Sequence, residues 1–458
     1  METWIHHSKN FFFLLLLAVG FIGCDDENRQ DMTPEIGEGE GTPSATMYTP
    51  TSGGKSTELT LYGTHFGMDL DKIRVTVNGV EAEVTGALGN IITAKVQRGS
   101  GSGIVKVYIG EGTSAKELTY KNEFEYSMSP LVSTYVGNYN PSDITKESKK
   151  EGLLTEAVLW KPGSIAFDKE GSLYIVEDDD RDIRLVKGNQ VSTFLRGEQT
   201  GGLLFRFMDM AVSLDGNTTF IANDANASGN AHIATMVWNN DGHTYENLSA
   251  IWSVTPSLGN GVTNVGVHPI TGEVFSISHG NAMIYKYDPV QKSMVSTGQQ
   301  LPGVTEGTVG SKVKIRSILF DKPGTTVYMS SQGQHVIYKG DYNMETGLFS
   351  NLQIWIGKYG TAGFKEGSGG TTLLEEPCQM DVDEEGNVYV AVRKKHRIAR
   401  ISPDGVMNSY TGTGTSGATD GPLDKAQYNH PEGVRFGTDG ALYISDYWNH
   451  KIRKIEKD

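Results

Sequence analysis

Histidine and arginine recur at one position of a repeated phrase in the C-terminal two-thirds of this chain. His335, His396 and His450 each stand two residues before an isoleucine that begins an apolar run, and Arg181 has the same place in an earlier copy. Imidazoles are zinc ligands and carboxylates bind calcium, so loops of this kind could hold a divalent cation. A position that recurs in several copies can also meet a structural need, such as a hydrogen bond in a turn, and we favour that interpretation. His279 lies in the corresponding loop of another copy.

Aromatic residues lie close to the same loops. They are Trp160, Tyr428, Tyr447 and Trp448. Flat rings can stack on the apolar faces of sugars, which would make these residues, with the basic and histidine residues above, candidate ligand contacts. Packing between neighbouring structural units is the alternative, because aromatic side chains also dominate the contacts of tightly packed cores.

Signatures of catalysis are weak. The chain has neither a G-x-S-x-G nor an H-E-x-x-H sequence, and Cys378 opens an apolar strand, where a buried, inert thiol is expected. The four carboxylates from Glu177 to Asp180 lack the alternation and the glycine of an EF-hand loop, so they are predicted to form a solvated acidic loop. No catalytic residue and no cofactor are therefore assigned, although a divalent metal would suit the loops.

An internal repeat predicts the fold that must position these residues. The phrase consists of an apolar strand, a glycine turn, a second strand with an aromatic residue, and a third strand. It occurs clearly at 162–186, 377–401 and 431–455 and more weakly at 208–222, 265–277 and 315–330, with turn glycines at 171, 216, 272, 324, 386 and 440. A fourth strand follows the phrase at 191–194 and at 407–410. Repeats of roughly 40 to 55 residues with four short strands are typical of β-propeller blades. Loops between second and third strands should then share one face of the propeller.

The repeat resembles the NHL family in Asn449-His450-Lys451-Ile452 and in the spacing from proline through Asp-Gly to Leu-Tyr. This resemblance implies a six-bladed propeller over residues 128–458. The last copy ends after its third strand, whereas residues 131–136 read like the fourth strand at Met407 to Thr411. We therefore expect residues 131–136 to complete the final blade and to cover an edge that would otherwise be open.

A second, smaller domain precedes the propeller. Apolar residues alternate with polar ones between Met47 and Tyr126, as in the strands of an immunoglobulin-like sandwich. Pro50, Gly53, the run from Gly63 to Gly67 and the run from Val77 to Ala82 resemble the IPT/TIG family. The resemblance implies an all-β domain over residues 46–127 that acts as a spacer or an interaction module.

The N-terminus predicts export and attachment to a membrane. An apolar run from Phe11 to Ile22 is too short for a spanning helix, and together with Gly23-Cys24 it resembles the signal of bacterial lipoproteins. We expect residues 1–23 to be a signal peptide, Cys24 to be lipidated, and residues 24–45 to be a flexible acidic tether. The acidic residues after Cys24 resemble the surface-export signal of Bacteroides-type lipoproteins, which implies an outer-membrane protein that faces the exterior.

The net charge of −15 argues against a nucleic-acid partner, because such proteins present clustered basic residues. The favoured hypothesis is a cell-surface protein that binds an extracellular ligand through one propeller face, with a glycan for carbohydrate uptake as the expected ligand. A propeller hydrolase or lyase with a metal-assisted channel site, and a scaffold for another outer-membrane protein, remain the alternatives.

Overall fold

The computed structural model describes residues 41–97, 99–126, 130–137, 139–177, 181–224, 230–239, 244–253, 261–279, 281–304 and 313–456. The chain divides into two compact units between residues 127 and 128. Within the described ranges there is no α-helix, and no helix is long and apolar enough to cross a membrane. Cys24, the signal segment 1–23 and most of the predicted tether lie outside these ranges.

The first unit is an immunoglobulin-like sandwich, as the alternating sequence predicted. Its strands are β1 (Ser44–Thr49), β2 (Ser52–Gly53), β3 (Glu58–Gly67), β4 (Ile73–Val77), β5 (Val80–Ala87), β6 (Gly89–Lys95), β7 (Gly103–Ile109) and β8 (Lys116–Tyr126). All pairings are antiparallel except that of β2 with β8. Period-two alternation buries Leu59 and Leu61 on β3 and Val75 and Val77 on β4, and these side chains form the core of the unit.

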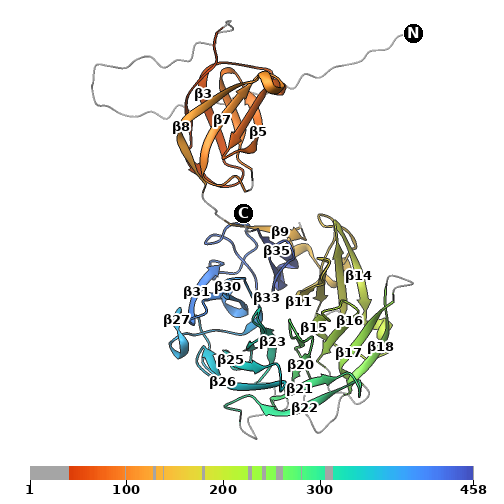
Figure 1. The fold of residues 1–458 in the computed structure, drawn as a ribbon. Coiled ribbons are helices and arrows are strands. Elements are labelled where there is room, and N and C mark those ends of the chain that lie inside the picture. Colours follow the sequence, from red (N-terminus) through yellow and green to blue (C-terminus); the bar gives the residue numbers. More distant parts are fainter. Residues whose placement is uncertain are drawn as a thin grey trace, which may run out of the picture. The chain divides into compact units, whose positions relative to one another are not determined.

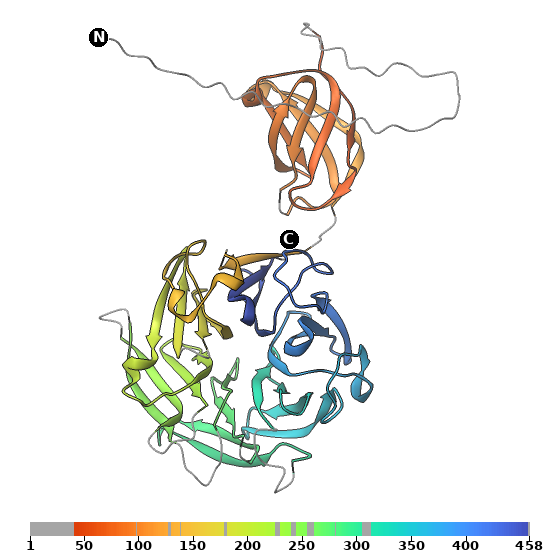
Figure 2. The same cartoon turned by 180° about the vertical axis from the view of Figure 1, so that it is seen from behind.

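The second unit is a six-bladed propeller (Figures 1 and 2). Blade one consists of β10 (Gly152–Leu153), β11 (Pro162–Phe167), β12 (Leu173–Glu177), β13 (Asp182–Lys187) and β14 (Gln190–Arg196). Blade two consists of β15 (Phe207–Val212), β16 (Thr218–Asn223), β17 (Ala231–Asn239) and β18 (Thr244–Ser253). Blade three consists of β19 (Gly266–Val267), β20 (Val274–Ile277), β21 (Met283–Asp288) and β22 (Ser293–Gln300).

The other three blades follow the same antiparallel plan. Blade four consists of β23 (Ile315–Phe320), β24 (Thr326–Ser331), β25 (Val336–Asn343) and β26 (Leu348–Ile356). Blade five consists of β27 (Gly367–Ser368), β28 (Pro377–Val382), β29 (Val388–Val392), β30 (Arg397–Ile401) and β31 (Val406–Thr411). Blade six consists of β32 (Gly421–Pro422), β33 (Pro431–Phe436), β34 (Leu442–Asp446), β35 (Lys451–Ile455) and β9 (Leu131–Val136).

The glycine turns and the ring closure are confirmed. Each of the six turn glycines has a φ between +72° and +84°, a conformation that side chains with a Cβ disfavour. Strand β9 pairs antiparallel with β35, with Val136 opposite Ile452 and Val132 opposite Ile455 (Figure 1). A strand from the start of the propeller therefore completes its last blade.

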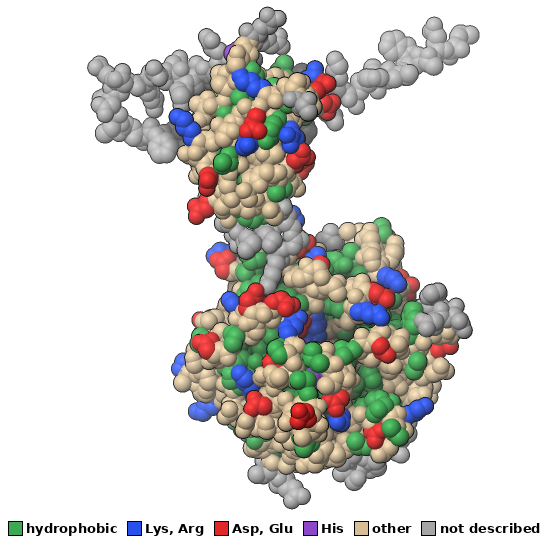
Figure 3. All heavy atoms as spheres, viewed as in Figure 1, with side chains coloured by type: hydrophobic (Ala, Val, Ile, Leu, Met, Phe, Trp, Pro, Cys, Tyr) green, Lys and Arg blue, Asp and Glu red, His purple; other side chains and the backbone are tan. Residues whose placement is uncertain are grey.

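Apolar side chains fill the spaces between blades, and each contact joins two neighbouring sheets. Val136 of β9 packs with Leu159 and Ile175 of blade one, for example, and Tyr443 packs edge-on against Phe167 at 5.0 Å between ring centroids. The space-filling view shows a hollow in one face of the propeller (Figure 3). The first strands, β11, β15, β19, β23, β28 and β33, bring their side chains toward a common axis.

Candidate functional site at the channel mouth

The recurrent histidines form a repeated contact between blades. His335, His396 and His450 all have left-handed backbone conformations, with φ of 61°, 50° and 57°. Each ring accepts a hydrogen bond at Nδ1 from the backbone N–H of a residue just before the next blade. The donors are Glu376 at 3.1 Å, His430 at 3.1 Å and Lys161 at 3.0 Å, respectively. The last of these bonds joins blade six to blade one.

These contacts give the repeated position a structural role. The imidazole nitrogen must be unprotonated to accept the bond, and burial lowers the pKa of His450 to about 4. Arg181 holds the same position in blade one, with φ of 59°, and its guanidinium lies 4.8 Å from the ring centroid of Phe205 before blade two. Each of the four side chains thus contacts the connection that leads into the following blade.

His279 occupies a different environment. Its side chain is buried, and Nε2 lies 2.7 Å from Oγ1 of Thr263. Burial lowers the pKa of His279 to about 4, so a neutral ring shares this hydrogen bond at pH 7. The described structure does not bring His279 together with His335, His396 or His450 in a group that could hold a metal ion.

The four candidate aromatic residues divide into buried and exposed rings. Tyr428 has no exposed surface, so its ring offers no face to a sugar and serves packing instead. Tyr447 is 4% exposed and contacts Trp448, which is 40% exposed, with 5.4 Å between the ring centroids. Trp160 stacks on His450 at 4.7 Å, and the ammonium of Lys161 lies 4.3 Å from the ring centroid of Trp448. We call Trp160 and Trp448 the aromatic shelf.

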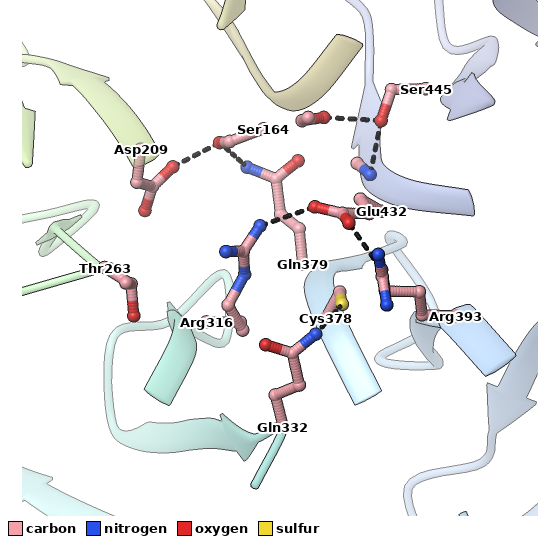
Figure 4. Close-up of polar contacts among 12 residues, drawn as sticks. Ser164, Asp209, Thr263, Arg316, Gln332, Cys378, Gln379, Arg393, Glu432 and Ser445 are labelled. Carbon is pink, nitrogen blue, oxygen red and sulfur yellow. Dashed lines mark hydrogen bonds and ion pairs between the residues drawn. The ribbon is translucent and has the colours of Figure 1, made fainter. Parts of the chain in front are cut away.

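Polar side chains from the first strands fill the centre of the propeller (Figure 4). The amide of Gln379 donates to Ser164 Oγ at 2.7 Å and to the carbonyl oxygen of Ile165 at 2.9 Å. Its oxygen accepts from the backbone N–H groups of Ile165 and Val434 at 3.2 and 3.1 Å. Ser164 in turn donates to Asp209. These bonds tie blades one, two, five and six together at the centre, so side chains fill the channel at this level.

A chain of ion pairs lies near the side chains that fill the centre (Figure 4). Glu432 is 3% exposed and accepts from Arg316 at 2.7 Å and from Arg393 at 2.5 Å. Arg393 also donates to Glu376 at 2.7 Å. Burial alone would raise the pKa of Glu432, but Arg316 and Arg393 hold it below its ordinary value. Glu432 is therefore an ionised anchor for two arginines and is not poised to donate a proton at neutral pH.

These residues line a cavity of about 400 Å³ at the channel mouth. Its walls come from loops between second and third strands, from the connections that enter the first strands, and from the starts of two first strands, β23 and β33. We call it the mouth cavity; its lining residues are Arg206, Lys314, Arg316, Gln332, Gly333, His335, Glu376, Arg393, Glu432 and Tyr447. Of the nine candidate ligand contacts, only His335 and Tyr447 are among them.

Sequence reasoning missed the residues that shape the centre of the site. Arg316 and Glu432 are charged residues at the start of strands that were predicted to be buried and apolar. Ser164, Asp209 and Gln379 each stand two residues after the first residue of a first strand. A polar residue within an otherwise apolar strand was the available signal, because buried charges are rare unless they are paired.

Cys378 and Glu177 are both fully buried. Cys378 is a free and fully buried thiol, and burial raises its pKa to about 12, as expected for an inert cysteine. The prediction that Glu177 belongs to a solvated loop is wrong. Its carboxylate is fully buried and lies 3.5 Å from the guanidinium of Arg184, which offsets the desolvation only in part, so burial raises the pKa of Glu177 to about 7. Residues 178–180 lie outside the described ranges.

Comparisons with known proteins agree with this architecture. A family model of the IPT/TIG domain matches residues 43–126, and a model of the NHL repeat matches residues 428–455. The crystal structure of an auxiliary nutrient binding protein from Bacteroides ovatus ATCC 8483 is 23% identical, with a TM-score of 0.72 over 92% of this chain and 99% of that chain. Another such protein, from Bacteroides thetaiotaomicron VPI-5482, is 24% identical, with a TM-score of 0.65 over 91% of this chain and 98% of that chain.

A curated plant protein is also similar in sequence. Protein SUPPRESSOR OF QUENCHING 1, chloroplastic, from Arabidopsis thaliana is 23% identical over 365 residues, which are 70% of this chain and 33% of that protein. The chain therefore spans about a third of the length of this relative, and likeness at these identities shows the fold alone. The protein thus consists of an IPT/TIG domain followed by a six-bladed β-propeller that includes an NHL repeat.

Proposed function

We propose that this protein binds an extracellular glycan at the mouth cavity and delivers it to a carbohydrate-uptake system. The observation that carries the proposal is a cavity of about 400 Å³, with polar walls, that adjoins the aromatic shelf through Tyr447. This volume lies within the range of about 300–1,000 Å³ that is typical of small-molecule sites. Polar walls can bond sugar hydroxyls, while the exposed ring of Trp448 can cover the apolar face of a neighbouring sugar.

The chemistry of the cavity favours binding over catalysis. Glu432 is held ionised between two arginines, and burial raises the pKa of the Cys378 thiol, which lies outside the cavity lining, to about 12, so its reactive thiolate is disfavoured. Fixed ion pairs also keep the walls of the cavity in place, which lowers the entropic cost of binding a ligand. The fold of two auxiliary nutrient binding proteins from Bacteroides supports a role in nutrient capture.

The proposal includes attachment to the outer membrane through a lipid on Cys24, with the propeller facing the exterior. It rests on the apolar run before Cys24 and on the acidic residues after it. Labelling of producing cells with a radioactive fatty acid tests this part. Label should be incorporated into the natural chain and should be absent from the C24S variant.

Binding to a glycan array tests the proposed function, and the Trp448→Ala variant tests the role of the shelf. Because Trp448 is 40% exposed, its removal should leave the melting temperature nearly unchanged. We expect it to weaken glycan binding about tenfold, which corresponds to about 1.4 kcal/mol. Tyr62→Ala is the matched control, since Tyr62 is an exposed aromatic residue on β3 of the IPT/TIG domain and lies outside the propeller. A chain that binds no glycan would overturn the proposal.

A further inference from the structure

A second cavity, of about 550 Å³, opens between blades one and two. It lies beside the turns between first and second strands, whereas the mouth cavity lies beside the loops between second and third strands. The two cavities are therefore at opposite ends of the strands. We call the second one the side cavity; its walls include the rings of Tyr174 and Phe194 from blade one, the ring of Tyr245 from blade two, and the carboxylate of Asp168.

The three rings of the side cavity meet edge to face. The ring centroid of Phe194 lies 5.1 Å from that of Tyr174 and 5.4 Å from that of Tyr245, with interplanar angles of 83° and 77°. Phe194 and Tyr245 are partly exposed, and Tyr174 lies deeper. Because the face of an aromatic ring carries partial negative charge, a cluster of this kind attracts cations.

Blade six contains the same kind of ring pair with a lysine beside it. Tyr443 of the second strand and Tyr135 of the outer strand lie 5.1 Å apart at 80°, like Tyr174 and Phe194 in blade one. The ammonium of Lys454 lies 5.4 and 5.7 Å from the two ring centroids of blade six. In blade six, therefore, an ammonium group occupies the place beside the ring pair.

A carboxylate completes this arrangement in blade six. Oδ2 of Asp439 accepts the hydroxyl of Tyr443 at 3.0 Å and lies 3.0 Å from the ammonium of Lys454. The ammonium is thus held by two rings and one carboxylate oxygen, which together compensate for part of its lost hydration.

The same register is basic in four blades but not in blade one. The residue opposite the aromatic residue of the second strand is Lys286, Lys339, Arg400 and Lys454 in blades three to six, respectively. The ammonium of Lys339 also lies close to its ring partner, 5.7 Å from the centroid of Tyr328. Blade two has the buried Thr235 in this register, and blade one has Leu185 opposite Tyr174. Leu185 lines the side cavity and supplies no charge.

Asp168 supplies the carboxylate in blade one. Its Oδ1 accepts the backbone N–H groups of Glu170 and Ser172 at 3.0 and 2.8 Å, and these bonds fix the carboxylate in its turn. Among the described residues, its Oδ2 accepts only the hydroxyl of Tyr174, at 3.4 Å. A carboxylate oxygen can accept more than one donor, as Asp439 Oδ2 does in blade six. Blade one therefore has the rings and the carboxylate but no lysine at the register of Lys454.

Two lysines line the side cavity at other positions. The ammonium of Lys169 donates to the carbonyl oxygen of Asp215 at 2.8 Å, and Lys187 is exposed. Three carboxylates line the cavity as well, so the two lysines do not give it a positive charge. The carboxylates belong to Asp168, Glu170 and Asp215.

We propose that the side cavity binds the ammonium group of a small organic cation, between the ring pair of Tyr174 and Phe194 and the carboxylate of Asp168. The cation would occupy the place that Lys454 fills in blade six. A volume of about 550 Å³ leaves room for carbon substituents on the nitrogen, which would contact the ring of Tyr245. This inference does not rest on the proposed function, because the site is separate from the mouth cavity.

Isothermal titration of the purified chain with three small molecules tests the inference. Choline supplies a quaternary ammonium, propylammonium supplies a primary one, and 3,3-dimethylbutan-1-ol has the shape of choline without its charge. We expect at least one cation to bind at least about tenfold more tightly than the neutral alcohol. Comparison of the two cations distinguishes a quaternary from a primary ammonium ligand. Equal binding of the alcohol, or no binding of either cation, would overturn the inference and leave the glycan proposal untouched.

Two variants locate the binding. Leu185→Lys brings a lysine to the register of Lys454, so it should weaken binding of the cation at least about tenfold. Its melting temperature and its glycan binding should stay close to those of the natural chain, because blades three to six carry a basic residue at this register. Asp168→Asn keeps an acceptor for the turn but removes the charge, and it should weaken cation binding about tenfold.

Asp439→Asn is the matched control for Asp168→Asn. Asp439 also lies in a turn between first and second strands and accepts a tyrosine hydroxyl, but Lys454 already occupies the place beside it. Cation binding by the control should equal that of the natural chain. Full binding by both Leu185→Lys and Asp168→Asn, or equal loss in Asp168→Asn and Asp439→Asn, would overturn the inference.

Discussion

His450 joins the last blade to the first through a single ring nitrogen. Its Nδ1 accepts the backbone N–H of Lys161, its ring stacks on Trp160, and its carbonyl oxygen accepts the hydroxyl of Tyr139. Blades four and five use His335 and His396 in the same way toward their own neighbours. A histidine with a left-handed backbone conformation, whose Nδ1 accepts a backbone N–H from the next blade, thus forms a repeated contact, or joint, between blades.

This joint should be sensitive to acid. Burial lowers the pKa of His450 from about 6.5 to about 4, so between these values the unfolded chain binds a proton that the folded chain does not. The contribution of His450 to stability is complete above pH 6.5 and is lost as the pH falls toward 4. The loss is at most about 1.4 kcal/mol per pH unit.

Replacement of His450 by Asn isolates this effect. Asparagine tolerates the left-handed conformation and keeps a neutral acceptor that does not titrate. We expect the free energy of unfolding of the natural chain, relative to H450N, to decrease as the pH is lowered from 6.5 to 4 in urea titrations. A difference that stays constant over this range would contradict the assignment of the proton to His450.

At the scale of the strand pair, blades one and six share a buried acid–arginine bridge. The last residue of the second strand supplies the carboxylate, and a residue of the third strand supplies the guanidinium. The pairs are Glu177 with Arg184 at 3.5 Å and Asp446 with Arg453 at 2.8 Å. Both arginines also donate to carbonyl oxygens of the connection before the first strand, and they thereby fasten this connection to the blade.

Removal of the buried partner of Arg453 should be far more harmful than removal of its exposed partner. Asp446 is fully buried, whereas the side chain of Asp420 is 45% exposed. At pH 7.5 Asp446 is ionised, because burial raises its pKa only to about 6. We expect Asp446→Ala to lower the free energy of unfolding by about 3 kcal/mol and Asp420→Ala by about 1 kcal/mol or less. Similar losses in both variants, measured by urea denaturation, would show that burial does not control this bridge.

At the scale of the whole molecule, closure of the propeller depends on strand β9. Residues 131–136 are more than 300 positions away from β35 in the sequence, yet the two strands pair side by side. Val132 and Val136 are buried in the cores on the two sides of blade six. Without β9, the outer edge of β35 would expose unpaired backbone groups, which promote aggregation.

Two truncations test this closure. A chain that lacks residues 1–127 keeps β9, so its propeller should unfold cooperatively at the temperature of the full chain. A chain that lacks residues 1–137 loses β9, and its melting temperature should fall by at least about 5 °C, with concentration-dependent aggregation. Calorimetry and light scattering measure both effects. Equal behaviour of the two truncations would show that β9 is dispensable for closure.

The strand pattern and the turn glycines were sufficient to predict the two folds and the ring closure. Each blade has its own apolar strands and its own glycine turn, so the pattern could be recognised in local sequence. The likeness of residues 132–136 to the fourth strand of blade five predicted the pairing of β9. The composition of the mouth cavity could not be predicted in this way. Arg206, Arg316 and Glu432 come from different blades and meet only because six first strands converge.

The sequence by itself thus determined the repeated elements, their order and the residues at the blade joints, because these features depend on contacts within a blade or with the next one. Only the tertiary structure decided which charges share a cavity, that Gln379 fills the centre of the channel, and that Tyr428 and Glu177 are buried. The physical reason is that pairing and desolvation depend on distances across the propeller. No spacing along the chain encodes those distances.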